Sequence, residues 1–386
     1  MTNSSLLDQT QLEKLRAKIN DEIDSGRMPA AQFSFAYENE VILTESFGDA
    51  GDDTLFNIFS ATKALIAGVV WQLIDEGKLS RTTLVRDILP EFGTRGTTSE
   101  WMGTITLENL LTHTSGFPTA PLGPPKWDTR ASRLEVMSRW RCTWEPGTRF
   151  EYHPTAAHWV VGEMIAEIEG RDHRDVVNDR ILGPLGLSDL HFGADNADLD
   201  VAPLVALGET PTAAEIKELT GIDIGDIDLS EVSPDILVAF NEPSIRAVGI
   251  PGAGGASTSA GLALFYQALL HNPDEMWSSV TLADGTASIL SNLPDPMTGV
   301  PSNRSLGLVI SGDDGLSAAR SMGPTVSSRT FGHNGAGGQI VWGDPESGIS
   351  FVFLTSAIER NFISEVRRIL SITAKAGLAT QPAMSR

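Results

Sequence analysis

Ser60 and Lys63 are the residues whose types and spacing point most directly to chemistry. They stand three positions apart in Phe59-Ser60-Ala61-Thr62-Lys63, and residues three apart on an α-helix share one face. If a helix begins here, the Ser60 hydroxyl lies beside the Lys63 amine. The unbonded N–H groups of the first turn then point toward whatever the serine attacks. The spacing therefore predicts a serine nucleophile next to its base.

The helix that carries this pair is predicted over residues 61–74, which are apolar on nearly every side. That composition indicates a helix buried over most of its circumference. Burial disfavours the charged form of a lysine, and so does the positive end of a helix dipole. We therefore expect Lys63 to be partly neutral. A Ser-x-x-Lys spacing also arises by chance, so the interpretation depends on other motifs.

Three further motifs follow in order along the chain. Residues 105–116 read Ile-Thr-Leu-Glu-Asn-Leu-Leu-Thr-His-Thr-Ser-Gly, residues 146–152 read Pro-Gly-Thr-Arg-Phe-Glu-Tyr, and residues 331–335 read Phe-Gly-His-Asn-Gly. With the serine–lysine pair, they resemble the signatures of the serine β-lactamase and penicillin-binding-protein-like hydrolases. The most similar branch is that of the class C β-lactamases with the related esterases and DD-peptidases (peptidase S12-like). Shorter matches at 89–92, 183–187 and 252–258 extend the resemblance over residues 15–375.

The resemblance implies that Ser60 forms an acyl-enzyme and that Lys63 and Tyr152 handle its proton. A tyrosine is ordinarily a poor base, but a neighbouring ammonium group stabilises its phenolate form. The sequence leaves open which of the two takes the proton. The alternative role for Tyr152 is that of a half-buried aromatic bonded through its hydroxyl.

The third motif, His333-Asn334-Gly335, resembles the strand that borders the family's site, which implies substrate contacts there. Gly335 would let substrate approach the backbone closely, and the amide of Ala336 would join that of Ser60 as the oxyanion hole. The alternative is an ordinary strand histidine at position 333.

Two departures from the family pattern bear on the substrate. His333 replaces the lysine of class C β-lactamases, and histidine is mostly uncharged near neutral pH, so the grip on a β-lactam carboxylate should weaken. Pro154 replaces the asparagine of the family's Tyr-x-Asn element, and proline has no side-chain amide to bond an acylamino group. The intervening His153 is expected beside the substrate. Both departures resemble the esterase branch.

Composition excludes several other functions. Fifty acidic against 28 basic residues give a net charge of −22, which disfavours nucleic-acid binding. Cys142 is the single cysteine, so an internal disulfide and a thiolate metal cage are ruled out, and no metal or organic cofactor is expected. The start lacks a signal-peptide pattern and no apolar run has membrane-spanning length, so a cytoplasmic protein without membrane association is the default expectation.

Hydrophobic periodicity predicts the elements that position the motifs. An amphipathic helix is expected over 11–25, hairpins over 31–47 and 338–355, and a last helix over 363–376. The resemblance adds an α/β (α+β) fold with a central antiparallel sheet flanked by helices. Residues 1–80 and 285–386 should form the sheet domain, residues 81–284 a mostly helical inserted domain, and the active site should lie between them. The acid-rich stretch 196–233 is expected to be a solvated loop or lid.

These expectations favour a serine hydrolase, a carboxylesterase acting on small or medium acyl esters. One alternative is a β-lactamase or DD-peptidase. Another is a catalytically inactive binding protein on the same scaffold, which the intact serine, lysine and tyrosine disfavour. The partner is expected to be a small-molecule ester, and amides or lactams stay possible. Acyl-chain preference and oligomeric state are left open.

Overall fold

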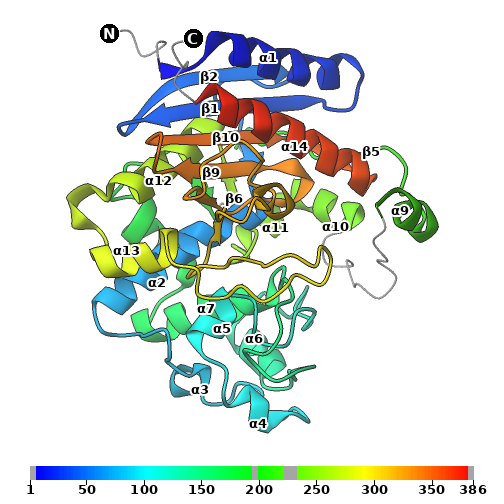
Figure 1. Cartoon of the computed structure of the whole chain (residues 1–386). Helices are drawn as coiled ribbons and strands as arrows, with labels where there is room; N and C mark the ends of the chain where they lie inside the picture. Colours follow the sequence, from blue (N-terminus) through cyan, green and yellow to red (C-terminus); the bar gives the residue numbers. More distant parts are fainter. Residues whose placement is uncertain (1–5, 194–198, 221–232, 381–386) are drawn as a thin grey trace.

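A six-stranded antiparallel sheet forms the upper half of the molecule (Figure 1). The computed structural model describes residues 6–193, 199–220 and 233–380. The strand order is β2-β1-β10-β9-β8-β7, with bounds β1 (Ala30–Tyr37), β2 (Glu40–Gly48), β7 (Val309–Ile310), β8 (Phe331–Gly332), β9 (Ile340–Asp344) and β10 (Ile349–Thr355). Strand β1 near the N-terminus pairs with β10 near the C-terminus, Ala31 opposite Thr355. The sheet therefore joins both ends of the chain.

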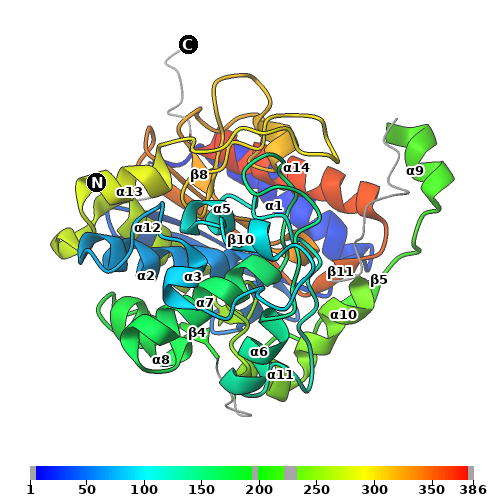
Figure 2. The ribbon, with the colours of Figure 1, turned by 90° about the horizontal axis from the view of Figure 1, so that it is seen from below.

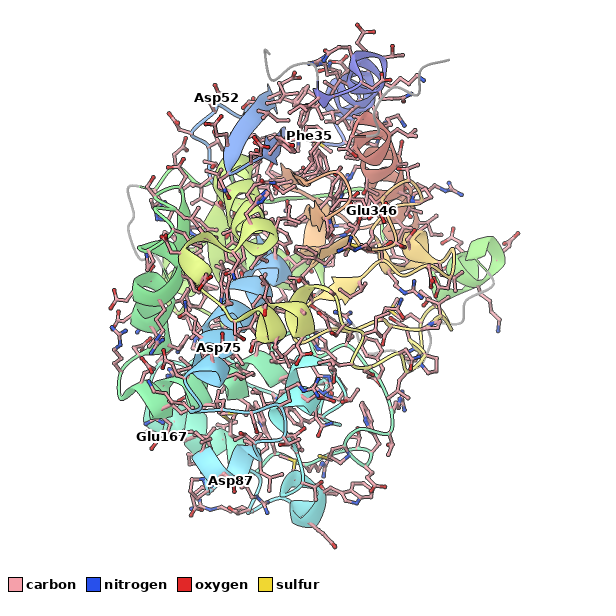
Figure 3. All side chains as sticks on the ribbon, turned by 60° about the vertical axis from the view of Figure 1, so that its left-hand side comes forward. Phe35, Asp52, Asp75, Asp87, Glu167 and Glu346 are labelled. Atoms are coloured by element: carbon pink, nitrogen blue, oxygen red, sulfur yellow. The ribbon has the colours of Figure 1, made fainter. Side chains whose placement is uncertain are left out.

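Helices cover both faces of the sheet because side chains alternate along its strands. On β1, Phe33 and Phe35 pack with α1 (Gln9–Asp24) and α14 (Phe362–Ala379) in one apolar core, and Figure 3 shows Phe35 inside the protein. The intervening Ser34 faces α12 (Ser259–His271), where its hydroxyl lies 2.7 Å from that of Ser259. Acidic side chains such as Asp52 lie at the outer surface (Figure 3).

The lower part of the molecule is mainly helical (Figures 1 and 2). Its long buried helices are α2 (Lys63–Asp75) and α7 (Ala156–Glu169). The shorter helices of the chain are α3 (Val85–Ile88), α4 (Ser99–Met102), α5 (Leu107–Leu111), α6 (Arg130–Met137), α8 (His173–Val177), α9 (Ala213–Thr220), α10 (Pro234–Val238), α11 (Pro243–Ala247) and α13 (Ser279–Thr286). Two small sheets complete the fold, β3-β6-β4 and β11-β5, formed by β3 (Phe56–Asn57), β4 (Leu190–Phe192), β5 (Val205–Leu207), β6 (Gly255–Ser257) and β11 (Ala357–Glu359).

The predicted fold class is confirmed, as are the terminal helices and both hairpins. Helix α12, which the predicted division at residue 284 places in the helical insert, packs on the main sheet, and the division itself stays a prediction. Sequence periodicity shows that α12 is buried without showing which layer buries it. Within the described parts of the chain, no helix has the length and apolar character needed to cross a membrane.

The acid-rich stretch 196–233 is not simply a loop. It contains β5, which pairs in parallel with β11, and helix α9. For these parts, the expectation of a solvated loop is therefore wrong, and that of a lid stays a prediction. Residues 196–198 and 221–232, with several of the acids of this stretch, lie outside the described residues.

Helix α7 begins directly after the segment that contains Tyr152. A buried carboxylate on this helix holds it in position. Glu163 on α7 is fully buried and bonds Arg133, itself almost completely buried, and the more exposed Arg130. Arg133 also donates to the carbonyl of Trp127 at 2.9 Å. The ion pair thus ties α7 to α6.

Glu163→Gln should lower the free energy of unfolding by about 3 kcal/mol, because it leaves the Arg133 charge buried without its counter-ion. Urea denaturation would measure this. The matched control is Glu167→Gln on the same helix, whose exposed pair with Arg130 should contribute less than about 1 kcal/mol. Equal losses in the two variants would contradict this role of the buried pair.

Candidate active site

Ser60 lies in a tight turn at the junction of two elements. It belongs to a 3-10 turn, Phe59–Thr62. Helix α2 begins only at Lys63, so Ser60 lies just before the α-helix and not within its first turn. The preceding Phe59 has φ of 44°, a backbone conformation that costs a bulky residue about 1–3 kcal/mol. Its ring is buried against Phe240, with centroids 5.2 Å apart, so packing holds the strained turn that presents the serine.

Three side chains from two distant segments meet at the Ser60 hydroxyl. Lys63 Nζ lies 3.0 Å from Ser60 Oγ, and Tyr152 donates its hydroxyl to the same oxygen at 2.8 Å. Lys63 Nζ also lies 5.1 Å from the centre of the Tyr152 ring. The predicted serine, lysine and tyrosine are therefore within hydrogen-bonding distance, although 92 positions separate Ser60 from Tyr152.

The surroundings of Lys63 favour its ammonium form. The side chain is fully buried, yet Nζ donates to the carbonyl oxygens of Pro154 at 2.7 Å and Gly252 at 2.8 Å. With Ser60 Oγ, these make three acceptors for the three N–H bonds of an ammonium group. Hydrogen bonds of this kind stabilise the charged form and oppose the desolvation on which the expectation of a partly neutral lysine rested.

The ring of His153 is bonded to backbone groups of the chain itself. Its ring is fully buried; Nδ1 lies 2.6 Å from the Glu151 carbonyl, and Nε2 accepts from the Phe117 amide at 3.1 Å. Its own amide donates to His113 Nδ1 at 3.2 Å. Both ring nitrogens are occupied, so His153 holds the backbone on either side of Tyr152, and its substrate contact stays a prediction.

The third motif lies at the end of β8, and the side chains of His333 and Asn334 are hydrogen-bonded within the protein. The Asn334 amide donates to the Ser321 carbonyl at 2.8 Å and accepts from the Val341 amide at 2.9 Å, so this side chain holds the loop, and a substrate contact remains a prediction only for the backbone. A Cβ on Gly335 would lie 2.3 Å from the Ile58 carbonyl oxygen. The glycine is thus required by the nucleophile turn itself. Ala336 follows at the start of a short turn, and its oxyanion role stays a prediction.

Arg304 is a residue of the site that the sequence interpretation missed. Its guanidinium carbon lies 5.5 Å from the centre of the Tyr152 ring and 5.2 Å from that of Phe150. One of its nitrogens, Nη1, is 3.4 Å from His333 Nε2. The third motif has lost its lysine, but a cation from another segment stands beside it. The histidine that replaces lysine in the third motif was the signal that could have prompted a search for another cation, because no local pattern marks residue 304.

Four buried histidines surround these groups: His113, His153, His158 and His333. Burial holds the pKa of each below its ordinary value, to about 3 for His153. The positive charges of Lys63 and Arg304 lower the pKa of His158 and His333 further. The histidines therefore stay neutral. Within the described residues, no group of three or more His, Cys, Asp or Glu is arranged to hold a metal ion.

His158→Leu should make stability less sensitive to acid. Neither ring nitrogen of His158 has a hydrogen-bond partner among the described residues. Its folded pKa is lowered, so the unfolded chain takes up a proton that the folded protein does not. Stability is then full above the unfolded pKa of about 6.5 and falls below it by about 1.4 kcal/mol per pH unit for each such histidine.

Relative to the wild type, the leucine variant should gain about 2 kcal/mol between pH 8 and pH 5, measured by urea denaturation. His271→Leu is the matched control, because His271 is exposed and should produce no relative gain. A parallel pH dependence in the wild type and His158→Leu would show that His158 is not a buried neutral base.

Comparisons with known proteins show what the chain is similar to. The curated relatives include "Esterase/beta-lactamase LipL" of Mycobacterium tuberculosis, 25% identical over 312 residues, which cover 77% of this chain and 68% of the relative. A "Putative D-alanyl-D-alanine carboxypeptidase" of Escherichia coli K12 is 22% identical over 379 residues, covering 90% of this chain and 82% of the relative.

Solved structures share the fold over nearly the whole chain. A penicillin-binding protein homologue from Caulobacter crescentus superposes with a TM-score of 0.74 at 24% identity, covering 97% of this chain and 99% of the other. A family VIII carboxylesterase superposes with a TM-score of 0.73 at 22% identity, covering 95% and 98%. The family model "Beta-lactamase" matches residues 15–372. The chain therefore belongs to the beta-lactamase family.

Proposed function

We propose that this serine hydrolase is a carboxylesterase that cleaves small or medium acyl esters through an acyl-Ser60 intermediate. The observation that carries the proposal is the convergence of Lys63 Nζ and the Tyr152 hydroxyl on Ser60 Oγ, at 3.0 and 2.8 Å. A nucleophile bonded to its base is the arrangement that covalent catalysis requires. No metal or organic cofactor enters the proposed reaction.

In the first half-reaction, Ser60 Oγ bonds to the ester carbonyl carbon while its proton moves to the base. The carbon–oxygen bond to the alcohol then breaks, and the alcohol leaves with that proton. In the second half, a water molecule attacks the acyl-enzyme and gives a proton to the same base. The carboxylic acid leaves, and the proton returns to Ser60 Oγ.

Tyr152 is the proposed base: its hydroxyl donates to Ser60 Oγ in the resting site, and after it loses that proton its oxygen can accept the Ser60 proton across the same 2.8 Å contact. Lys63 donates hydrogen bonds to three acceptors, which favours its ammonium form. An ammonium group has no lone pair with which to accept the serine proton. The Lys63 nitrogen lies 5.1 Å from the centre of the Tyr152 ring, which leaves the tyrosine oxygen as the acceptor for the serine proton. The oxyanion formed on attack would be bound by the backbone amides of Ser60, which lies within the turn Phe59–Thr62, and of Ala336, which follows Gly335.

Preference for esters over amides rests on the surroundings of the nucleophile. At position 154, a proline offers no side-chain amide, and Lys63 already uses its carbonyl oxygen. His333 is held neutral by burial, which lowers its pKa. Neither residue can give the contacts expected for the acylamino group and carboxylate of a penicillin. The cation of Arg304 favours a second candidate, β-lactam or peptide hydrolysis.

Turnover of 4-nitrophenyl acetate and butyrate, compared with that of a chromogenic cephalosporin, tests the proposal. The esters should be hydrolysed with the higher kcat/KM. Efficient hydrolysis of the cephalosporin with negligible ester turnover would favour the second candidate.

Ser60→Ala should reduce ester turnover by at least about 10⁴-fold, because the acyl acceptor is gone. A fluorophosphonate should add one phosphonyl group to the wild type and none to this variant, as measured by intact-protein mass spectrometry. Absence of the adduct on folded wild-type protein would indicate a binding protein on this scaffold.

Tyr152→Phe should lower the acylation rate by about 10² to 10⁴-fold, because it removes the proton acceptor but keeps the ring beside Lys63. Stopped-flow measurement of the 4-nitrophenol burst would report acylation alone. Tyr37→Phe, which removes a hydroxyl from strand β1, is the control. A burst of normal rate in Tyr152→Phe would transfer the role of base to Lys63.

A further inference from the structure

A cavity of about 250 Å³ lies in the helical part of the molecule, lined by the end of α3 and the segment after it, by α6, and by α7. Its floor is apolar, because Leu89, Phe92 and Met137 are buried there. Ile88 and Leu134 are partly buried in its walls. The cavity thus offers a ligand an apolar surface from two separate segments of the chain.

Hydrogen bonds and an ion pair hold the walls of this cavity apart from one another. The Gly93 amide donates to the Met137 carbonyl at 3.1 Å, and the Arg95 amide donates to the Ser138 carbonyl at 2.8 Å. The buried ion pair of Glu163 joins the other two walls, α6 and α7. Protein interiors are close-packed, and an empty apolar cavity costs stability. A preformed cavity of this size therefore indicates an occupant.

The charged residues of the lining compensate one another. The carboxylates of Glu135 and Glu167 are each paired with a neighbouring arginine, at 2.6 and 2.5 Å. The remaining two, Glu91 and Arg95, have opposite charges. All four are exposed, so they lie at the mouth of the cavity, and Figure 3 shows Glu167 at the surface. The mouth has no excess charge to attract an ion, and the floor would strip an ion of its water. An uncharged apolar molecule is the ligand that fits.

The volume limits the size of that ligand. An apolar cavity of about 150 Å³ lined by Leu, Ile and Phe binds benzene. In proportion, a cavity of 250 Å³ accepts about ten non-hydrogen atoms, as in a bicyclic aromatic compound. A peptide segment of another protein could place only one side chain in it and would lay the rest across the charged mouth. A small molecule is therefore the better occupant.

Packed rings separate this cavity from the candidate active site. The ring of Phe92, in the floor, lies 5.8 Å from that of Phe117, which lies 5.3 Å from the ring of His153. Tyr152 follows only after these rings, next to His153 in the chain. A molecule in the cavity would therefore not touch Ser60.

We propose that this cavity is a second binding site, which takes an uncharged apolar molecule of bicyclic size while the ester binds at Ser60. The inference goes beyond the proposed esterase function and does not depend on it. The apolar floor supplies the affinity, and the compensated mouth supplies the selectivity against ions.

Titration calorimetry with 2-naphthol, an uncharged bicyclic probe, tests the proposal. The wild type should bind it with a Kd of about 1 mM or lower, as expected for a ligand of this size. Two ions with the same rings, 2-naphthoate and 2-naphthylmethylammonium, should bind at least about tenfold more weakly. Protein that carries the phosphonyl group on Ser60 should bind 2-naphthol with an unchanged Kd, because only the catalytic serine is blocked.

Leu134→Trp should raise the Kd of 2-naphthol by at least about tenfold, because the larger side chain fills the cavity. Ala131→Trp is the matched control, since it adds the same ring at an exposed position of α6 and should leave the Kd unchanged. If Leu134→Trp does not fold, Ile88→Phe fills the cavity from α3, and the same loss of affinity is expected.

Absence of 2-naphthol binding to the folded wild type would overturn the proposal. So would binding that a folded cavity-filling variant leaves unchanged, or binding that the phosphonyl group on Ser60 abolishes, since the probe would then occupy another place. Equal or tighter binding of either ion would overturn the assignment of an uncharged ligand. Ester turnover and the adduct on Ser60 test the esterase function separately.

Discussion

The buried amine of Lys63 is the interaction on which the candidate site depends. Its three hydrogen bonds join the turn at Ser60, the segment after Tyr152 at Pro154, and the loop before β6 at Gly252. These segments lie far apart in the sequence, and a lysine in a fully apolar setting would be unstable as a cation. The carbonyl oxygens stabilise its charge and also fix the relative positions of nucleophile and phenol.

The electrostatics of the site follow from burial. Four histidines are packed close to two cations, and burial lowers the pKa of each. Positive charge therefore stays on Lys63 and Arg304 and does not spread over the imidazoles. A neutral His153 can accept from the Phe117 amide and at the same time donate to the Glu151 carbonyl, which keeps the Tyr152 backbone in place. Neutral histidines in this arrangement are structural supports for a cationic centre.

The nucleophile turn shows why small residues recur around it. Gly335 lies against the Ile58 carbonyl, and a Cβ on Gly252 would meet the Pro154 carbonyl at 2.9 Å and Lys63 Nζ at 3.2 Å. Larger side chains at either position would separate the segments that must meet at Ser60. The same close packing maintains the strained backbone at Phe59. The contacts that position the serine therefore also stabilise the core.

Local patterns in the sequence were sufficient to predict the serine–lysine pair, the terminal helices, both hairpins and, through the resemblance, the position of Tyr152 and the fold class. These features depend on spacing and periodicity within a few dozen residues. The roles of Asn334 and His153 could not be predicted in this way, because both depend on backbone groups that other segments bring to them. Only the tertiary structure places Arg304 beside His333, since a buried charge is recognised by what surrounds it and not by its neighbours in the chain.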